Sequence, residues 1–384
     1  MNGIRKVCFF TGKRGGFTHL IPVVKRINKS DKLDYCVLAS DMHLSNVFGN
    51  TINEIKRWAE NVYCVDSMLS SHSRVSRAKS IGIGLMSCAQ MLDTIKPDLV
   101  FILGDRGETL AMAISAMEMN IPILHLFGGD LTQGGVDEPT RHTITKMANV
   151  HFTSNQESAD RILRMGEEPW RVHNVGSPAL DLIREKRFTT PNDIYAKFKL
   201  DKNNPILILL QHSVTWQVEE AECQINKTMK AIDSLGYQTI GIYPCSDPGY
   251  DAIINVLSRY EDRSYFQLYK NINFPDFWGL MNVASVFVGN SSAGIMETSS
   301  FRVPFVNIGI RQEGRLRADN VIDVEHDEDH IVEAVKIAIF DKQFKRRVES
   351  CVSPYGDGES SEKIVGILEN IEINDALIRK KMTY

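Results

Sequence analysis

Short apolar runs alternate with amphipathic stretches along almost the whole chain. Runs rich in β-branched and aromatic residues predict strands in the first half at Lys6–Phe10, Tyr35–Ala39, Val62–Val65, Leu99–Leu103, Ile121–Leu126, Val150–Thr153 and Val172–Val175. Helical spacing lies between them, at Arg74–Ile95 and Thr109–Met119. Both faces of these strands are apolar, which is typical of a parallel sheet with helices on each side. The alternation therefore predicts an α/β fold with a doubly wound sheet.

A second alternation follows the polar, strand-free segment Ile183–Pro205, which we interpret as a linker and the first helix of another domain. The strands predicted there are Ile206–Leu210, Thr239–Tyr243, Tyr265–Leu268, Ser285–Val288 and Pro304–Ile308. The helices predicted there are Glu219–Leu235, Asp251–Tyr260 and Ser361–Ile371. We expect a first Rossmann-like domain over 1–182, a second over 183–360, and a C-terminal helix within 361–384 that packs back toward the first domain. Because parallel sheets bind ligands at the carboxyl ends of their strands, we expect the two domains to face each other across a ligand-binding cleft.

Composition narrows the class of protein without identifying it. The 384 residues are 43% hydrophobic and 24% charged, with a net charge of -4, so nothing indicates a nucleic-acid or membrane partner. The seven cysteines are scattered and form no CxxC pair, which favours reduced thiols over a disulfide framework or a zinc site. The N-terminus shows no signal peptide, and no apolar run reaches the ~18 residues of a membrane span. A cytoplasmic location is expected.

Several loops that follow predicted strands of the first half carry ionisable residues. The loop Thr11–His19 matches neither a dinucleotide nor a P-loop motif, but its glycines, its helix start and Arg14 suit an anion; a plain strand-to-helix turn is the alternative. Asp105 and Arg106 follow the strand Leu99–Leu103, either as an acid or base beside a ligand contact or as a structural ion pair. His43 is either a ligand contact or a packing residue. The loop His125–His142 contains four glycines, three carboxylates, two histidines and an arginine, more than a chain reversal requires.

The second half offers loops that suit a diphosphate. His212 follows the strand Ile206–Leu210 directly, and a histidine there suits proton transfer or a phosphate contact. In the loop Val288–Thr298, two serines and a helix start can bind phosphates, and a later glutamate can accept hydrogen bonds from ribose hydroxyls; a simple serine cap is the alternative. The histidines of Glu325–His330 have HxxxH spacing, but acids are common in a first helical turn, so we expect no metal site.

Taken together, these motifs resemble the UDP-N-acetylglucosamine 2-epimerase family, in its hydrolysing branch, from Lys6 to about Val324. The matching segments are MHLS at Met42–Ser45, GDR at Gly104–Arg106, HxxGG(D/E) at His125–Asp130, (D/E)(D/E)xxRHxITK at Asp137–Lys146, QHxV at Gln211–Val214, GNSSxG at Gly289–Gly294 and RQxGR at Arg311–Arg315. The family has the GT-B fold, which agrees with two facing Rossmann-like domains.

The resemblance implies roles for individual residues. Those expected to act in acid/base catalysis or beside the leaving group are Asp105, Asp137, His212, Asp130 and Glu138. Those expected to bind the UDP-sugar are Arg14, Thr18, His43, Arg106, Phe127, His142, Ser291, Ser292, Gly294, Glu297 and Arg311. No cofactor and no metal are expected, and the protein is expected to be a homodimer or homotetramer.

Three positions depart from the family pattern, and all lie on the sugar side. Phe127 stands where many members have the glutamate of HxEGG, Gly16 where an acid is common, and Asp41 where glycine is usual. The usual candidate for the C2 base is then missing, so Asp105, Asp130 or Asp137 takes that duty, or the sugar pocket differs. Asp105 is the first choice, and Asp137 is the next residue to test.

The expected reaction removes the C2 proton, expels UDP to give a 2-acetamidoglucal, and adds water on the other face. The first hypothesis is UDP-N-acetylglucosamine as substrate and N-acetylmannosamine as product, for sialic-acid synthesis. The alternatives are UDP-N,N'-diacetylbacillosamine as substrate, for legionaminic acid, a GT-B glycosyltransferase, or a non-catalytic nucleotide-sugar sensor.

Overall fold

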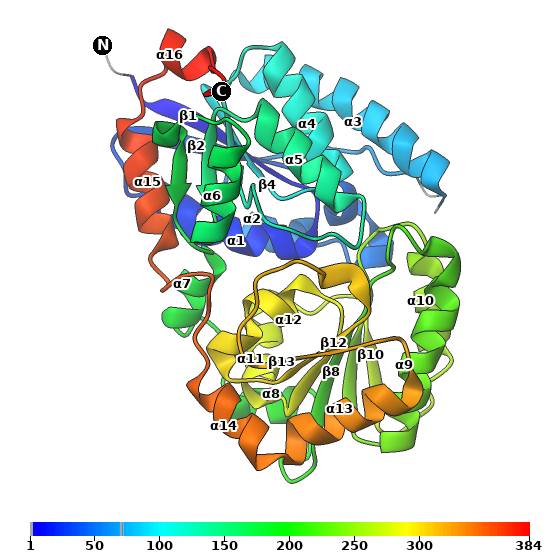
Figure 1. Ribbon diagram of the computed structural model, residues 1–384. Helices are drawn as coiled ribbons and strands as arrows, with labels where there is room; N and C mark the ends of the chain where they lie inside the picture. The colour runs from blue at the N-terminus through cyan, green and yellow to red at the C-terminus, as the bar shows by residue number, and fades with distance from the viewer. Residues whose placement is uncertain (1–2, 70, 72) are drawn as a thin grey trace. The chain divides into compact units, whose positions relative to one another are not determined.

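A computed structural model describes residues 3–69, 71 and 73–384, and the chain divides into two compact units (Figure 1). The first unit consists of Met1–Asp130, Asp137–Arg184 and Tyr355–Tyr384, and the second of Leu131–Val136 and Glu185–Pro354. The domains predicted at 1–182 and 183–360 differ from these bounds by a few residues at each end, and positions 1, 2, 70 and 72 lie outside the described residues. No sequence signal indicates that the short segment 131–136 belongs to the second unit.

The first unit contains a sheet of parallel strands in the order β3-β2-β1-β4-β5-β6-β7. Their bounds are β1 Arg5–Thr11, β2 Leu33–Ser40, β3 Val62–Val65, β4 Leu99–Leu103, β5 Ile123–Leu126, β6 Val150–Thr153 and β7 Val172–Asn174. Every residue of β4 is buried, as its uninterrupted apolar sequence predicts for a strand between two neighbours. The strand order reverses between β1 and β4, which makes that position a topological switch point.

Helices of the first unit pack in two groups. The helices are α1 Arg14–Ile27, α2 Ile52–Trp58, α3 Arg74–Ile95, α4 Gly107–Glu118, α5 Asp137–Met147, α6 Gln156–Arg164, α7 Ala179–Arg184, α15 Ser360–Asn370 and α16 Asp375–Ile378, with 3₁₀ turns η1 Asp41–Leu44, η2 Asn46–Phe48 and η3 Pro169–Arg171. Helices α3 and α4 pack on each other, and their apolar residues join those of β1, β2 and β4 in one buried cluster. Helices α1, α7 and α15 pack together in the other group.

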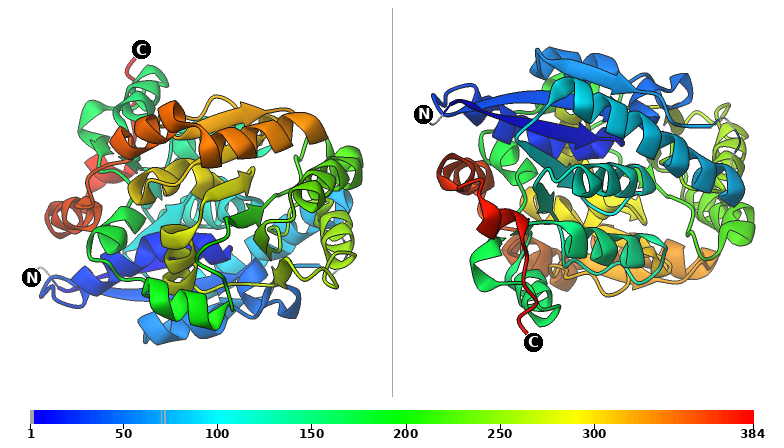
Figure 2. Two further views of the ribbon diagram at one scale, coloured as in Figure 1. Left: turned by 90° about the horizontal axis from the view of Figure 1, so that it is seen from below. Right: turned by 90° about the horizontal axis from the view of Figure 1, so that it is seen from above.

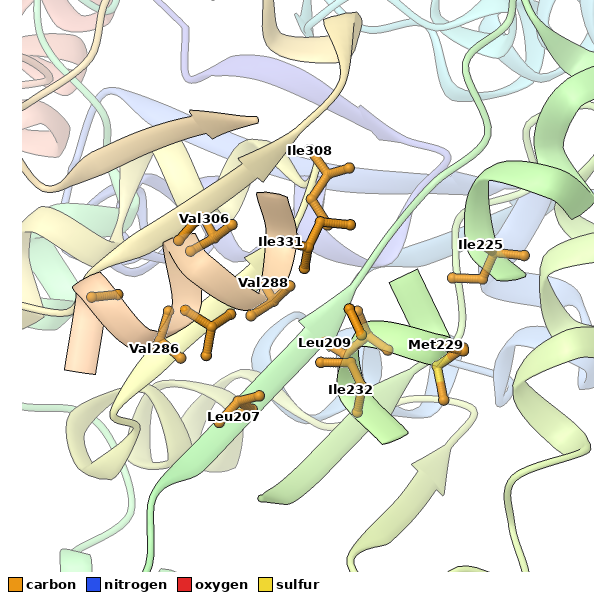
Figure 3. Packing of buried hydrophobic residues seen from close by; sticks show 14 of the residues in the cluster. Leu207, Leu209, Ile225, Met229, Ile232, Val286, Val288, Val306, Ile308 and Ile331 are labelled. Atoms are coloured by element: carbon orange, nitrogen blue, oxygen red, sulfur yellow. The ribbon is translucent and has the colours of Figure 1, made fainter. Parts of the chain in front are cut away.

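The second unit repeats this plan with parallel strands in the order β10-β9-β8-β11-β12-β13. The strands are β8 Ile206–Leu210, β9 Gln238–Ile242, β10 Phe266–Tyr269, β11 Val286–Gly289, β12 Phe305–Ile308 and β13 Val321–Val324. The helices are α8 Pro191–Lys197, α9 Ala221–Leu235, α10 Tyr250–Ser258, α11 Phe274–Val283, α12 Ser292–Met296, α13 Glu328–Phe340 and α14 Lys342–Ser350, with 3₁₀ turns η4 Val218–Glu220, η5 Thr298–Phe301 and η6 Ile310–Gln312. Figure 3 shows the core, in which β8, β11 and β12 pack against α9 and α13.

The predicted α/β class of two doubly wound sheets is confirmed, and each predicted strand is present within a few residues of its expected bounds. The prediction omitted β13. This edge strand pairs only with β12 among the described strands, and all its residues are at least partly exposed, so no apolar run marks it. Within the described residues, no helix is long and apolar enough to cross a membrane.

The C-terminal segment returns to the first unit, where α15 packs against α1 (Figure 2). Asp181 of α7 accepts hydrogen bonds from the backbone amides of Ser360 and Ser361, at 2.9 and 2.7 Å, and so caps the first turn of α15. The side chain of Arg26, in α1, donates to the Ser361 hydroxyl at 2.9 Å.

Both sheets have the strand order 3-2-1-4-5-6 that binds ligands at the carboxyl ends of the strands beside the reversal. The loops at these positions follow β1 and β4 in the first unit, and β8 and β11 in the second. The candidate ligand-binding loops are therefore residues 12–19 and 104–109 of the first unit, and residues 211–217 and 290–298 of the second.

Candidate active site

The loop after β1 leads directly into α1, and the start of this helix suits an anion. Arg14 is the first helical residue, and Thr18 lies one turn later; both side chains are partly exposed. Lys13, which precedes the helix, provides no side-chain cap. The positive end of the helix dipole and a guanidinium thus lie together at a switch point.

Next to this loop, the buried side chains of Asp41, Arg106 and Glu108 form a charged network with the partly exposed Arg77. Arg77 pairs with Glu108, and its Nη1 lies 3.1 Å from Oδ1 of Asp41. The Nε of Arg106 lies 3.5 Å from Oε1 of Glu108. Burial raises the pKa of Glu108, but Arg77 and Arg106 outweigh burial and hold this pKa below its usual range. A Cβ on Gly12 would come within 2.2 Å of Glu108 Cγ, so the network and the β1 loop are packed without room for a side chain.

His43 lies behind the β1 loop. Its Nε2 is 2.9 Å from the Thr11 hydroxyl, its Nδ1 is 2.8 Å from the Thr51 hydroxyl, and the side chain is buried. Burial lowers the pKa of His43 to about 3, so the ring is neutral at physiological pH. Both ring nitrogens are thus engaged with threonine hydroxyls inside the first unit, and the predicted ligand contact of His43 stays a prediction.

The loop after β5 is fastened to β4 and α5. His125 Nε2 lies 2.7 Å from the Gly104 carbonyl oxygen, and since a carbonyl only accepts, Nε2 carries the proton. Its Nδ1 faces the Thr145 hydroxyl at 3.3 Å, and burial lowers the pKa of His125 to about 3. A Cβ on Gly128 would come within 2.9 Å of both partners' polar atoms, Nδ1 and Oγ1, which accounts for glycine there.

Phe127 adopts a backbone conformation that is unusual for a bulky residue, with φ of 69°. Its amide donates to the Phe152 carbonyl at 2.9 Å, and its buried ring meets the ring of His19 edge-on at 4.9 Å. Such conformations persist where the surrounding structure imposes them, and they cluster at functional sites. The substitution of Phe for an acid therefore comes with a fixed aromatic pair.

Arg141 organises the carboxylates of the first unit. This fully buried residue of α5 pairs with Asp105, donates to Glu138 Oε2 at 3.1 Å, and donates to the Asp130 carbonyl at 2.8 Å. His142 Nε2 lies 3.1 Å from the other oxygen of Glu138. Asp105, foremost among the neighbouring acids, raises the pKa of Arg141 despite its burial.

The other expected acids lie close to the same arginine. Asp137 is the first residue of α5 and is partly exposed. Burial lowers the pKa of Arg141, but Asp105, Asp130 and, to a smaller extent, Asp137 raise it. The side chain of Asp130 is buried and accepts hydrogen bonds from two serine hydroxyls of the β6–α6 segment. Asp105, Asp130 and Glu138, expected separately from the sequence, are thus gathered around one guanidinium.

In the second unit, His212 and Asn290 join the loops after β8 and β11. The His212 amide donates to Asn290 Oδ1 at 2.7 Å, and Asn290 Nδ2 donates to the His212 carbonyl at 2.9 Å. The Cys245 amide donates to His212 Nδ1 at 2.9 Å. A nitrogen that accepts a hydrogen bond carries no proton, so the neutral ring of His212 has its proton on Nε2.

The GNSS loop presents its serines at the start of the short helix α12. Ser291 precedes the helix and accepts from the Ala293 amide at 3.4 Å, while Ser292 is the first helical residue and is partly exposed. A Cβ on Gly294 would lie 2.4 Å from the ring of Phe305, so glycine lets α12 pack on β12, and its predicted ligand contact stays a prediction.

Glu297 and Arg311 complete the set of predicted ligand residues. Loss of water raises the pKa of Glu297 to about 7, although the hydrogen bond from Trp278 Nε1, at 2.6 Å, lowers it. Arg311 donates to the Asn290 carbonyl at 3.1 Å, and its Nη2 lies 3.8 Å from Asp247. The protonated and the ionised forms of Glu297 are therefore both populated near neutral pH.

The two histidines of Glu325–His330 have different surroundings. A Cβ on Gly309 would meet His326 Nε2 at 2.3 Å, while His330 lies near Asp327 on the surface. In the part of the chain that the structure describes, no three His, Cys, Asp or Glu side chains form a group that could hold a metal ion.

Some site residues were not predicted. Arg141 is the arginine of the motif (D/E)(D/E)xxRHxITK at Asp137–Lys146, and this match could have indicated it. Arg77, Glu108, Ser154 and Ser158 carry no sequence signal, because their partners are brought to them only by the fold.

The comparisons agree with the motifs. A profile of the UDP-N-acetylglucosamine 2-epimerase family matches residues 25–369. A UDP-N,N'-diacetylbacillosamine 2-epimerase (hydrolyzing) of Legionella pneumophila is 35% identical, over 99% of this chain and 100% of that protein. A GDP/UDP-N,N'-diacetylbacillosamine 2-epimerase (hydrolyzing) of Campylobacter jejuni is 31% identical, over 97% of each.

Among solved structures, that of UDP-GlcNAc 2-epimerase from Neisseria meningitidis bound to UDP-GlcNAc shares the fold. Its TM-score is 0.79 at 18% identity, over 94% of this chain and 99% of that one. The doubly wound α/β class therefore holds across the whole length compared.

Proposed function

Since this chain belongs to the UDP-N-acetylglucosamine 2-epimerase family, we propose that it is a hydrolysing epimerase whose sugar nucleotide is UDP-N,N'-diacetylbacillosamine. The observation that carries the choice of sugar is the end-to-end similarity to two enzymes named for that sugar, at 35% and 31% identity. The first hypothesis from the sequence, UDP-N-acetylglucosamine, becomes the second candidate. The coarser activity, a hydrolysing 2-epimerase acting on a UDP-sugar, is common to both.

The aromatic pair of Phe127 and His19 supports the same sugar. Diacetylbacillosamine is a 6-deoxy, 4-acetamido sugar, and so it offers fewer hydroxyl groups than N-acetylglucosamine. A buried ring held edge-on to a histidine suits a methyl or acetamido group better than a hydroxyl, which would lose its hydrogen bonds there.

The reaction begins at C2 of the sugar. A carboxylate takes the C2 proton, the C–H electron pair forms the C1–C2 double bond, and the C1–O bond breaks so that UDP leaves with its electrons. Water then adds to the glucal, with hydroxyl at C1 and a proton at C2 on the opposite face, and the free sugar is released. Two proton transfers at one carbon require more than one acid/base group, and the cluster around Arg141 provides them.

The carboxylates of that cluster differ in their surroundings. Asp105, the first choice for the C2 base from the sequence, forms an ion pair with the buried Arg141, which neutralises its charge. Asp130 has no such side-chain ion pair among the described residues, and we assign it the removal of the C2 proton. Asp105, Asp137 and Glu138 remain candidates for returning the second proton.

The second unit carries the nucleotide in this proposal. His212 donates a hydrogen bond from Nε2–H to the departing diphosphate. Ser291, Ser292 and Arg311 offer further donors, Glu297 accepts from the ribose hydroxyls, and Arg14 of the first unit adds positive charge. Donors fixed in advance stabilise the charge that develops as UDP leaves, so the proposed chemistry involves no metal.

The test is incubation with each UDP-sugar in heavy water. We expect release of UDP and of a free sugar deuterated at C2, at least ~10-fold faster from UDP-N,N'-diacetylbacillosamine than from UDP-N-acetylglucosamine, the usual scale of such discrimination. Faster turnover of the N-acetylglucosamine compound would reverse the order of the two sugars. UDP release only with an added acceptor would indicate a glycosyltransferase, and binding without any turnover would indicate a sensor.

A further inference from the structure

Asp130 is seated on the first turn of α6. The preceding residue, Gly129, has φ of 76°, and a Cβ there would lie 2.4 Å from the Ser158 carbonyl oxygen. Oδ1 of Asp130 accepts hydrogen bonds from the hydroxyls of Ser154, at 2.6 Å, and Ser158, at 2.7 Å. Both serines are buried. The carboxylate thus lies at the positive end of a helix, with one oxygen held by two donors.

Asn155 orients both serines. Its Nδ2 donates to the Ser154 hydroxyl oxygen at 2.9 Å, so the Ser154 proton is directed to Asp130. Its Oδ1 accepts from the Ser158 amide at 2.9 Å and caps α6, which fixes the backbone from which the second hydroxyl projects.

The backbone around Asp130 is held as firmly as its side chain. Arg141 donates to the Asp130 carbonyl at 2.8 Å, and Arg161 donates to the Gly129 carbonyl. Two guanidinium groups therefore fix the main chain while two hydroxyls fix the side chain.

One atom of this residue stands apart. Oδ2 of Asp130 is buried and has no hydrogen-bond partner among the residues that the structure describes. Buried polar atoms are normally paired, so an exception calls for an explanation, of which a catalytic role is one. The terminal torsion of aspartate is broad, so the two hydroxyls at Oδ1 decide which way Oδ2 points.

We propose that Ser154 and Ser158 are positioning residues for the epimerisation, which hold Oδ1 of Asp130 so that Oδ2 alone meets the C2 proton. This inference rests on the proposed function, within which Asp130 is the base. The serines touch the carboxylate and not the sugar. Their loss lets the carboxylate rotate, and the fraction of complexes in which an oxygen faces the C–H bond falls.

The experiment compares Ser154→Ala, Ser158→Ala and the double variant with Ser115→Ala. Ser115 is a buried serine of the same unit whose hydroxyl donates to the Leu85 and Ala111 carbonyls instead of to Asp130. We expect kcat of the double variant to fall roughly 10- to 100-fold, with each single variant in between. The Kd of UDP and the turnover of Ser115→Ala should stay within about twofold of wild type.

A merely structural role is separated by two further measurements. Ser158→Thr, which keeps the hydroxyl, should restore most of kcat relative to Ser158→Ala. In an Asp130→Asn background, adding the two serine changes should lower C2 deuterium exchange no further, because the serines then have no catalytic carboxylate to hold.

Three results overturn the proposal: a double variant with wild-type kcat, an equal loss in Ser115→Ala, or a further loss of exchange in the Asp130→Asn background. If wild-type protein released no free sugar from either UDP-sugar, the proposed function would fail first. If the wild type were active and the serine variants kept its kcat, only the positioning role would be wrong. Single variants and UDP binding keep the test decisive if the double variant folds poorly.

Discussion

At His212, a single backbone amide decides where the ring proton lies. Cys245 donates to Nδ1, so Nε2 is a donor whether the ring is neutral or charged. A residue fixed in this way is suited to hydrogen-bonding a departing phosphate. Removing a proton at Nε2 would first require the loss of the proton already there.

We therefore predict that His212→Ala folds but loses at least ~100-fold in turnover, the usual effect of losing a charge-stabilising donor. His212→Gln places an amide N–H near the position of Nε2 and should stay within about tenfold of wild type. Steady-state kinetics and UDP titration of both variants test this. Equal losses in the two variants would argue for proton transfer instead, and wild-type turnover in His212→Ala would remove the residue from the mechanism.

Glu297 predicts a pH dependence of nucleotide binding. Because its raised pKa is about 7, the carboxyl is mostly protonated at pH 6 and mostly ionised at pH 8. Ribose hydroxyls donate more strongly to the ionised form, so the affinity for UDP should rise with pH, up to roughly tenfold across this range.

The matched control is Glu297→Gln, in which only ionisation of the UDP phosphate remains. Calorimetric titration at pH 6, 7 and 8 should show a smaller change for this variant. The same pH profile in both proteins would mean that Glu297 does not bind the ribose hydroxyls.

At the scale of elements, the sequence predicted the buried strands but missed an exposed strand at the sheet edge. The run LVFIL of β4 predicts a strand because both its faces are covered, whereas β13 lies at a sheet edge and its partly exposed residues hide it. Loops after strands could be selected as candidate sites for the same reason: their position follows from the alternation of β and α.

The candidate site was predicted residue by residue more poorly than loop by loop. The loop 125–142 could be chosen from its acids, but nothing in the sequence joined Asp105 to Arg141, 36 positions apart. Likewise, His43 and Gly294 occupy matching motifs while the structure engages one with two threonines and packs the other on Phe305. Such pairings depend on tertiary packing, which periodicity does not encode.

The cap on α15 gives a stability prediction for one element. Asp181→Ala removes the acceptor for two buried amides, which costs about 1–2 kcal/mol. Hydrogen exchange of α15 amides should accelerate by a factor of roughly 5–30. Asp160→Ala, at an exposed position of α6, is the control and should leave this exchange unchanged. Unchanged exchange in Asp181→Ala would mean that the helix is held by its apolar face alone.

At the scale of the whole molecule, two units repeat one strand order and carry different chemistry. The carboxylates gather in the first unit, and the serines, His212 and Glu297 belong to the second. In our proposal the carboxylates of the first unit act on the sugar, and the residues of the second unit bind the nucleotide. The expected homodimer or homotetramer stays a prediction, which light scattering tests.

For the complete enzyme we predict turnover after exhaustive chelation. Charge on the leaving diphosphate is met by arginine and by hydroxyl and backbone N–H donors in our proposal, so a divalent ion has no assigned role. The rate should stay within about twofold of the untreated protein in excess EDTA. Loss of activity that Mg²⁺ restores would show that this account of the leaving group is wrong.

The return of the C-terminal segment to the first unit has a consequence for biosynthesis. Residues 355–384 leave the ribosome after the whole second unit, yet they complete a sheet domain whose first strand was made at the outset. Arg171 and Asn149 find the Leu377 carbonyl only at that stage. Because domains tend to fold as they emerge, the second unit is able to fold while the first still lacks its closing helix. A nascent chain stalled before Tyr355 would thus combine a complete second unit, which binds the nucleotide in our proposal, with a first unit that lacks its closing helix.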